Sequence, residues 1–213
     1  FRNRIMGPFV DAVPGLHDAV QLGKIFDLER EETRGRPTWD LIVVDAPATG
    51  HGLTMLTSAR SLMDLTRAGP LHEGVRRVDT VLGNPDKTGL VLVALPEEMP
   101  VNETLELWRG LGPAQAQGRL LVLNQVRRRP LTDAVWATAA PQLRGSGNPA
   151  VAEATDLTDR WMARVRQQDG ARKRLAAGLD CPVLDFAWCG PEPVSPDDLN
   201  TLADGIGAEL ELR

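Results

Sequence analysis

The segment LIVVDAPATGHG, residues 41–52, runs from four apolar residues into an aspartate and then into a loop of small residues. Four consecutive apolar residues that end at a carboxylate are typical of a buried strand in a parallel sheet. Asp45 would then stand at the carboxyl edge of that sheet, where ligands bind in folds of this class. Aspartate is also common as a turn or helix-capping residue after a strand, so the motif alone leaves both interpretations open.

Further apolar runs of the same kind lie at residues 90–95, 120–123 and 183–186. The intervening sequence shows helical spacing of apolar residues, most clearly over residues 98–111, 150–177 and 196–210. This alternation predicts an α/β fold with a doubly wound, mostly parallel sheet flanked by helices, as a single domain over residues 1–213. The glycine-containing stretch at residues 144–150 is predicted to be a loop.

The composition argues against a nucleic-acid-binding protein and against a membrane-spanning protein. The 213 residues include 42% hydrophobic and 25% charged residues, and the formal net charge of −5 argues against general affinity for nucleic acid or anionic membranes. No apolar run approaches the ~18 residues of a membrane span, and we expect a cytoplasmic protein. Cys181 and Cys189 form no metal-binding spacing and are expected to be reduced thiols. Because the chain starts at Phe1, we expect natural sequence upstream.

The loop after Asp45 allows a second interpretation beside a plain turn, namely a nucleotide site. Backbone N–H groups, a hydroxyl and the imidazole of His51 would suit contact with a phosphate, and Asp45 would be a Walker B aspartate that holds Mg²⁺ through water. The phosphate-binding motif GxxxxGK[ST] does not occur in the chain. His51 could instead be a structural histidine, and Asn124 could instead be a turn residue. The run Arg127-Arg128-Arg129 is interpreted as a solvated charge run.

Five segments together resemble the ArsA/Get3-like (anion-transporting ATPase) family of deviant P-loop ATPases. DLIVVDAPATGHGLTML, residues 40–56, is similar to the family's switch II region. Val13-Pro14-Gly15-Leu16-His17 followed by LGKIFDL resembles its helix before the Walker B strand. The start of one family helix is similar to ALPEEMPVNETLELW, residues 94–108. The family strand beside the adenine is similar to LLVLNQV, residues 120–126, and its C-terminal strand is similar to CPVLDF, residues 181–186. The resemblance covers nearly the whole chain in order, and it implies the C-terminal two-thirds of such an ATPase, an incomplete P-loop NTPase fold.

The resemblance implies roles for individual residues. Asp45 would be catalytic on the magnesium side, Asn124 would contact adenine, and switch II would contain Pro47, Thr49, Gly50 and His51. It also implies ATP and Mg²⁺ as ligands of the full-length protein and a homodimer or a paired paralogue as the assembly. The client or transported substrate is not implied.

One departure from the family decides between functions. The P-loop is absent from these residues, so we expect the isolated chain to have no ATPase activity. The alternative is a non-enzymatic partner subunit or scaffold that keeps the fold without hydrolysis; a third reading is an unrelated α/β binding domain. For a nucleotide site, Asp45 and Asn124 should lie at the same edge of the sheet.

Overall fold

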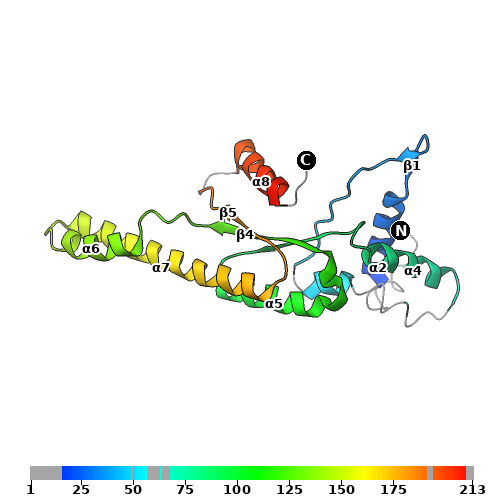
Figure 1. Ribbon diagram of the computed structural model, residues 1–213, viewed down its shortest axis with the longest axis horizontal. Coiled ribbons are helices and arrows are strands. Elements are labelled where there is room, and N and C mark those ends of the chain that lie inside the picture. The colour runs from blue at the N-terminus through cyan, green and yellow to red at the C-terminus, as the bar shows by residue number, and fades with distance from the viewer. Residues whose placement is uncertain (1–15, 49, 57–62, 64–67, 191–193, 210–213) are drawn as a thin grey trace, which may run out of the picture. The chain divides into compact units, whose positions relative to one another are not determined.

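The computed structural model describes residues 16–48, 50–56, 63, 68–190 and 194–209. Helices and strands alternate along the chain, as the ribbon in Figure 1 shows. In order, the elements are α2 (Leu16–Glu29), β1 (Glu32–Thr33), β2 (Arg36–Pro37), α4 (Pro70–Leu82), β3 (Leu90–Ala94), α5 (Glu98–Leu111), a 3₁₀ helix (Gly112–Gln117), β4 (Gly118–Val126), α6 (Asp133–Arg144), α7 (Pro149–Gly178), β5 (Val183–Ala187) and α8 (Pro196–Glu209).

The chain divides into two compact units, which are described separately. Unit 1 is Phe1–Gly89 with Leu107–Gln117, and unit 2 is Leu90–Glu106 with Gly118–Arg213. In unit 1, α2 packs against α4 around a small apolar core of buried side chains, namely Leu22, Met55, Val75 and Val78. The β1–β2 hairpin turns through Arg34 and Gly35, both with positive φ, as a tight two-residue hairpin turn requires.

Unit 2 contains a three-stranded parallel sheet in the order β3-β4-β5. Helices α7 and α8 both contact β5, and they lie on opposite sides of it in Figure 1. The predicted α/β class is therefore confirmed. The three strands match the predicted runs at 90–95, 120–123 and 183–186, and α5, α7 and α8 match the predicted helices closely.

The central strand β4 forms the core of unit 2. Its four residues from Leu120 to Leu123 are at most 5% exposed, as expected for a strand covered on both faces. Helix α7 approaches α5 closely, since a Cβ on Gly178 would lie 2.4 Å from a methyl carbon of Leu105. Strand β3 differs, because it is an edge strand whose Val91 and Val93 are 49% and 65% exposed.

The expected strand at residues 41–44 is not formed. Residues 41–47 form no regular secondary structure and pair with no other described segment, and Leu41 and Val43 are 79% and 83% exposed. An apolar run becomes a strand only where a neighbour accepts and donates its backbone hydrogen bonds. The prediction of a buried strand ending at Asp45 is therefore wrong for the described chain.

None of the helices in the part of the chain that the structure describes has the length and apolar character that a membrane span requires.

Candidate functional site

Asp45 lies in unit 1, on the segment that leads into a helical turn. Its side chain is exposed, and it makes no hydrogen bond or ion pair with another described residue. A carboxylate without a protein partner keeps all its acceptor positions for water, a cation or a ligand group. The geometry is thus compatible with a ligand-facing aspartate and gives no support to a helix-capping role.

The predicted switch II residues surround the start of a helix over residues 50–56. Pro47 lies on the approach to it, and Gly50 and His51 are its first described residues and are exposed; Thr49 lies outside the described residues. The backbone turns tightly here, since a Cβ on Gly52 would lie 2.7 Å from the carbonyl oxygen of Pro47. Asp45, Pro47, Gly50 and His51 are therefore all exposed on one short segment of the chain.

This segment is attached to the end of α5. A Cβ on Gly110 would lie 2.7 Å from a methyl carbon of Leu53, so the leucine occupies the space that a side chain at position 110 would need. The hydroxyl of Thr54 donates to the carbonyl oxygen of Gly50 at 2.9 Å, which closes the first helical turn. Packing and hydrogen bonding together fix the helix that follows Asp45.

Asn124 lies in unit 2, where the pairing of β4 with β5 is interrupted. The register shifts between Leu123 and Val126, and Gln125 adopts a φ of 60°, an uncommon conformation for a residue other than glycine. Asn124 Oδ1 accepts a hydrogen bond from the backbone N–H of Gln125 at 2.8 Å. Bulges of this kind are frequent beside functional sites. The hydrogen bond supports a turn role for Asn124, and its Nδ2 group remains as a donor.

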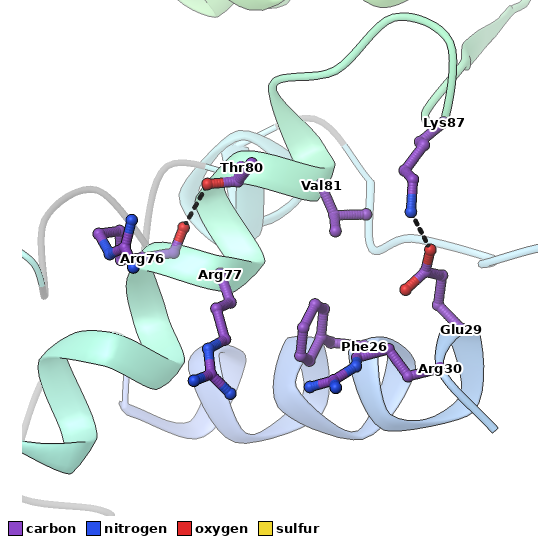
Figure 2. Close-up of a pocket in the computed structure, with 8 residues that line it drawn as sticks. All are labelled: Phe26, Glu29, Arg30, Arg76, Arg77, Thr80, Val81 and Lys87. Atoms are coloured by element: carbon purple, nitrogen blue, oxygen red, sulfur yellow. Dashed lines mark hydrogen bonds and ion pairs between the residues drawn. The ribbon is translucent and has the colours of Figure 1, made fainter.

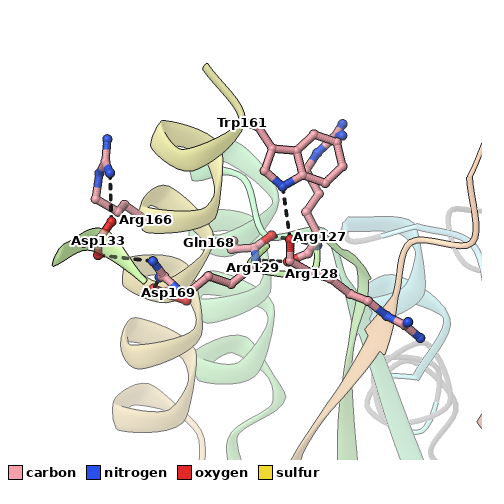
Figure 3. Close-up of polar contacts among 8 residues, drawn as sticks. All are labelled: Arg127, Arg128, Arg129, Asp133, Trp161, Arg166, Gln168 and Asp169. Atoms are coloured by element: carbon pink, nitrogen blue, oxygen red, sulfur yellow. Dashed lines mark hydrogen bonds and ion pairs between the residues drawn. The ribbon is translucent and has the colours of Figure 1, made fainter. Parts of the chain in front are cut away.

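The chain after this bulge is held by α7, as Figure 3 shows. Gln168 is buried, and its amide accepts from the N–H of Arg127 at 2.9 Å and donates to the carbonyl of Arg127 at 2.6 Å. Trp161 donates from Nε1 to the carbonyl oxygen of Arg128 at 3.0 Å. These three bonds satisfy backbone groups that leave the sheet and therefore fix the path of the chain beyond Asn124.

The side chain of Arg127 packs against two tryptophans. Its guanidinium carbon is 4.9 Å from the ring centroids of both Trp161 and Trp188, and the two rings are 6.0 Å apart. Both distances are within the range of cation–π attraction. The interpretation of this arginine as part of a solvated charge run is therefore wrong. Nothing local in the sequence indicates the contact, because the two tryptophans come from distant segments.

Arg129 is also paired. It forms ion pairs with Asp133, at 3.1 Å, and with Asp169, and Arg166 forms a second pair with Asp133 at 2.9 Å. The group joins the start of α6 to α7, although its members are partly exposed and contribute little individually. Arg128 has an exposed side chain, which lines a neighbouring cavity.

That cavity, of about 200 Å³, lies between the end of β5 and α8. Its wall combines the aromatic rings of Phe186 and Trp188 with the charged groups of Arg128 and Asp198. A flat ring with polar edges would suit such a lining, because aromatic walls favour stacking while the charged groups orient the polar edge.

Hydrogen bonds and burial shift the pKa values of two groups that line this cavity, Asp198 and Cys189. Asp198 Oδ2 accepts from both the hydroxyl and the N–H of Ser195, at 2.7 and 2.9 Å, and these bonds lower the pKa of Asp198. Desolvation raises the pKa of the Cys189 thiol, and the hydrogen bond to Asp198 adds to the effect. Cys181 and Cys189 are both free thiols. Among the described residues, no group of three or more possible metal ligands is present.

Comparison with known proteins gives a relationship to ATPases. No family model matches the chain. It is 31% identical over 199 residues, 93% of its length, to a putative ATPase of Mycobacterium bovis, to a putative ATPase of Mycobacterium tuberculosis, and to the ATPase BagA of Mycobacterium tuberculosis. The chain spans about half the length, 52%, of these curated relatives. It is thus homologous, over nearly all its residues, to proteins named as ATPases.

Proposed function

We propose that the complete protein containing this chain is an ATP-binding and ATP-hydrolysing switch ATPase of the ArsA/Get3 type. The observation that carries the proposal is the 31% identity to ATPase-named proteins over 93% of the chain. It is supported by the Asp45 segment, in which an exposed carboxylate with no partner among the described residues precedes a helical segment described over residues 50–56. The N-terminus of a helix favours anionic groups such as phosphate.

Magnesium is the cation that the Asp45 carboxylate suits. In nucleotide sites, Mg²⁺ takes one or two carboxylates together with substrate phosphates and keeps several waters. A single exposed aspartate with no partner among the described residues fits that requirement without a larger set of acidic ligands. The ion would neutralise charge on the phosphates, and Asp45 would orient the water in its shell.

The other residues would bind and position the nucleotide. The tight approach of Pro47 to Gly52 and the packing of Leu53 on Gly110 hold the helix start after Asp45 in a defined place, as catalysis by positioning requires. Asn124 would use its remaining Nδ2 donor toward the base. We further propose that nucleotide binding closes a homodimer, or a dimer with a paralogue, in the cytoplasm, and that hydrolysis reopens it.

Steady-state kinetics of the complete protein test this assignment. Asp45→Asn keeps the shape of the side chain and removes its charge, so ATP turnover should fall by about 100-fold or more, while ATP binding weakens less. Asp40→Asn is the matched control, because Asp40 is an exposed carboxylate just upstream, and it should leave turnover within about twofold. Normal hydrolysis by the Asp45 variant would refute its role.

Asn124→Ala separates binding from chemistry in the same assay. Loss of a base contact made equally in the ground and transition states should raise KM for ATP, leave kcat nearly unchanged and reduce the preference for ATP over GTP. An unchanged KM and base preference would leave Asn124 as a residue of the bulge only. ATP binding without turnover in the complete wild-type protein would instead favour the non-enzymatic partner subunit.

A further inference from the structure

A basic hollow of about 460 Å³ lies between α2 and α4 in unit 1, away from the Asp45 segment in the sequence (Figure 2). Four of its eight lining residues are cationic, namely Arg30, Arg76, Arg77 and Lys87, and one is acidic, Glu29. The chain as a whole carries a formal charge of −5, so this surface opposes the general charge of the protein. A local excess of cations in an acidic chain raises the concentration of anions at that place.

The only acidic group of the lining is already neutralised. Glu29 Oε1 lies 2.5 Å from Lys87 Nζ, and this pair joins the end of α2 to the loop before β3. The carboxylate is therefore not available to the arginines of the same hollow. Arg77 has a separate partner in Glu73 at 3.6 Å on its own helix, an exposed pair of small energy that an incoming anion can displace.

Arg30, directly after the end of α2, and Arg77 of α4 flank the ring of Phe26 in Figure 2, whereas Arg76 points away from α2 in that view. The guanidinium carbon of Arg30 is 5.5 Å from the ring centroid, within cation–π range. Phe26 itself packs against the buried core of unit 1. The core thus holds the ring of Phe26, and the ring positions the guanidinium of Arg30. The guanidinium of Arg77 lies on the other side of the ring, and no carboxylate of the lining lies between the two arginines.

We propose that this hollow binds the phosphate group of a small organic phosphate, with Arg30 and Arg77 as its two hydrogen-bond donors. A guanidinium is a planar fork that binds two oxygens at once, and two forks from opposite sides need an anion with at least three terminal oxygens. Phosphate monoesters meet this condition and carboxylates do not. The ring of Phe26 and the side chain of Val81 supply an apolar wall for the organic part of the ligand.

Isothermal titration of the full chain with phenyl phosphate tests the site, with EDTA present to exclude metal-dependent binding elsewhere. The double variant Arg30→Gln/Arg77→Gln should weaken binding by about tenfold or more, as loss of two charge-assisted contacts requires. The matched control, Arg34→Gln/Arg36→Gln, removes two exposed arginines of the β1–β2 hairpin in the same unit and should change the dissociation constant less than twofold. Circular dichroism melting establishes that both variants are folded.

A lysine variant, a carboxylate ligand and lipid vesicles complete the test of the phosphate site. Arg77→Lys keeps the charge but loses the fork, and an intermediate loss of affinity supports guanidinium recognition. Equal weakening in the two double variants, or none in either, would overturn the assignment, as would equally tight binding of phenylacetate. Sedimentation with phosphatidylcholine vesicles containing phosphatidic acid distinguishes a lipid headgroup from a soluble ligand. Vesicle binding that needs both arginines, without binding of phenyl phosphate, would refute the small-ligand site.

Discussion

Gln168 holds the chain where it leaves the central strand, so its replacement should have a measurable energetic cost. Gln168→Leu keeps a similar volume at a site that is 5% exposed and removes both hydrogen bonds to the backbone of Arg127. The backbone N–H and the carbonyl oxygen of Arg127 would both lose their hydrogen-bond partner. Tightly packed α7 leaves the leucine little freedom to compensate.

The magnitude follows from the surroundings of Arg127. A buried polar group left unsatisfied costs about 1–3 kcal/mol. Arg127 is only half-buried, so water can partly replace the amide, and the lower end of that range applies to each of the two groups. We therefore expect the free energy of unfolding to fall by about 2 kcal/mol.

Urea denaturation followed by tryptophan fluorescence measures this change as a lower midpoint at constant slope. Gln167→Leu is the matched control, because Gln167 is the exposed neighbour on the same helix and the substitution is identical. It should alter the free energy of unfolding by no more than about 0.5 kcal/mol. Equal midpoints for the two variants would refute the role of Gln168 in holding the end of β4.

Two further predictions concern backbone space and ionisation. Gly52→Ala places a Cβ 2.7 Å from the carbonyl oxygen of Pro47 and should destabilise the chain by about 1–3 kcal/mol in thermal or urea unfolding, whereas Gly74→Ala, with open space at its Cβ, should stabilise α4 by about 0.5–1 kcal/mol; destabilisation by both or by neither contradicts the close contact. Ser195→Ala removes the hydrogen bond that its hydroxyl donates to Asp198 Oδ2, so carbon-detected NMR titration should show the lowered pKa of Asp198 moving up. Because that pKa is depressed in the folded state, the stability it contributes is present above the ordinary aspartate value and is lost as pH falls through the depressed one; an unmoved pKa would refute the cause.

Local sequence patterns predict the fold well where the surroundings agree with them. Helix α5 was expected from the spacing of Val101, Leu105, Trp108 and Leu111, and all four side chains are buried. The continuous apolar run in β4 is likewise buried between neighbouring strands. The run at residues 41–44 has the same composition but pairs with no described strand, because pairing depends on a partner that composition does not specify.

Some residues of the candidate sites could be predicted from the sequence and others could not. Asp45 and Asn124 could be singled out because each is a polar residue at the end of an apolar run. Gln168 could not, since its partner is a backbone group 41 positions away and a glutamine on a helix carries no signal of that contact. The basic hollow was also missed, because Arg30 and Arg77 meet only when α2 packs on α4.

Release of phosphate from ATP by the complete natural protein is the most direct test of the proposed function. We expect turnover that requires magnesium, is abolished by EDTA and falls by about 100-fold in Asp45→Asn but not in Asp40→Asn. Absence of turnover in a folded wild-type protein that still binds ATP, or turnover indifferent to both magnesium and Asp45, would contradict it.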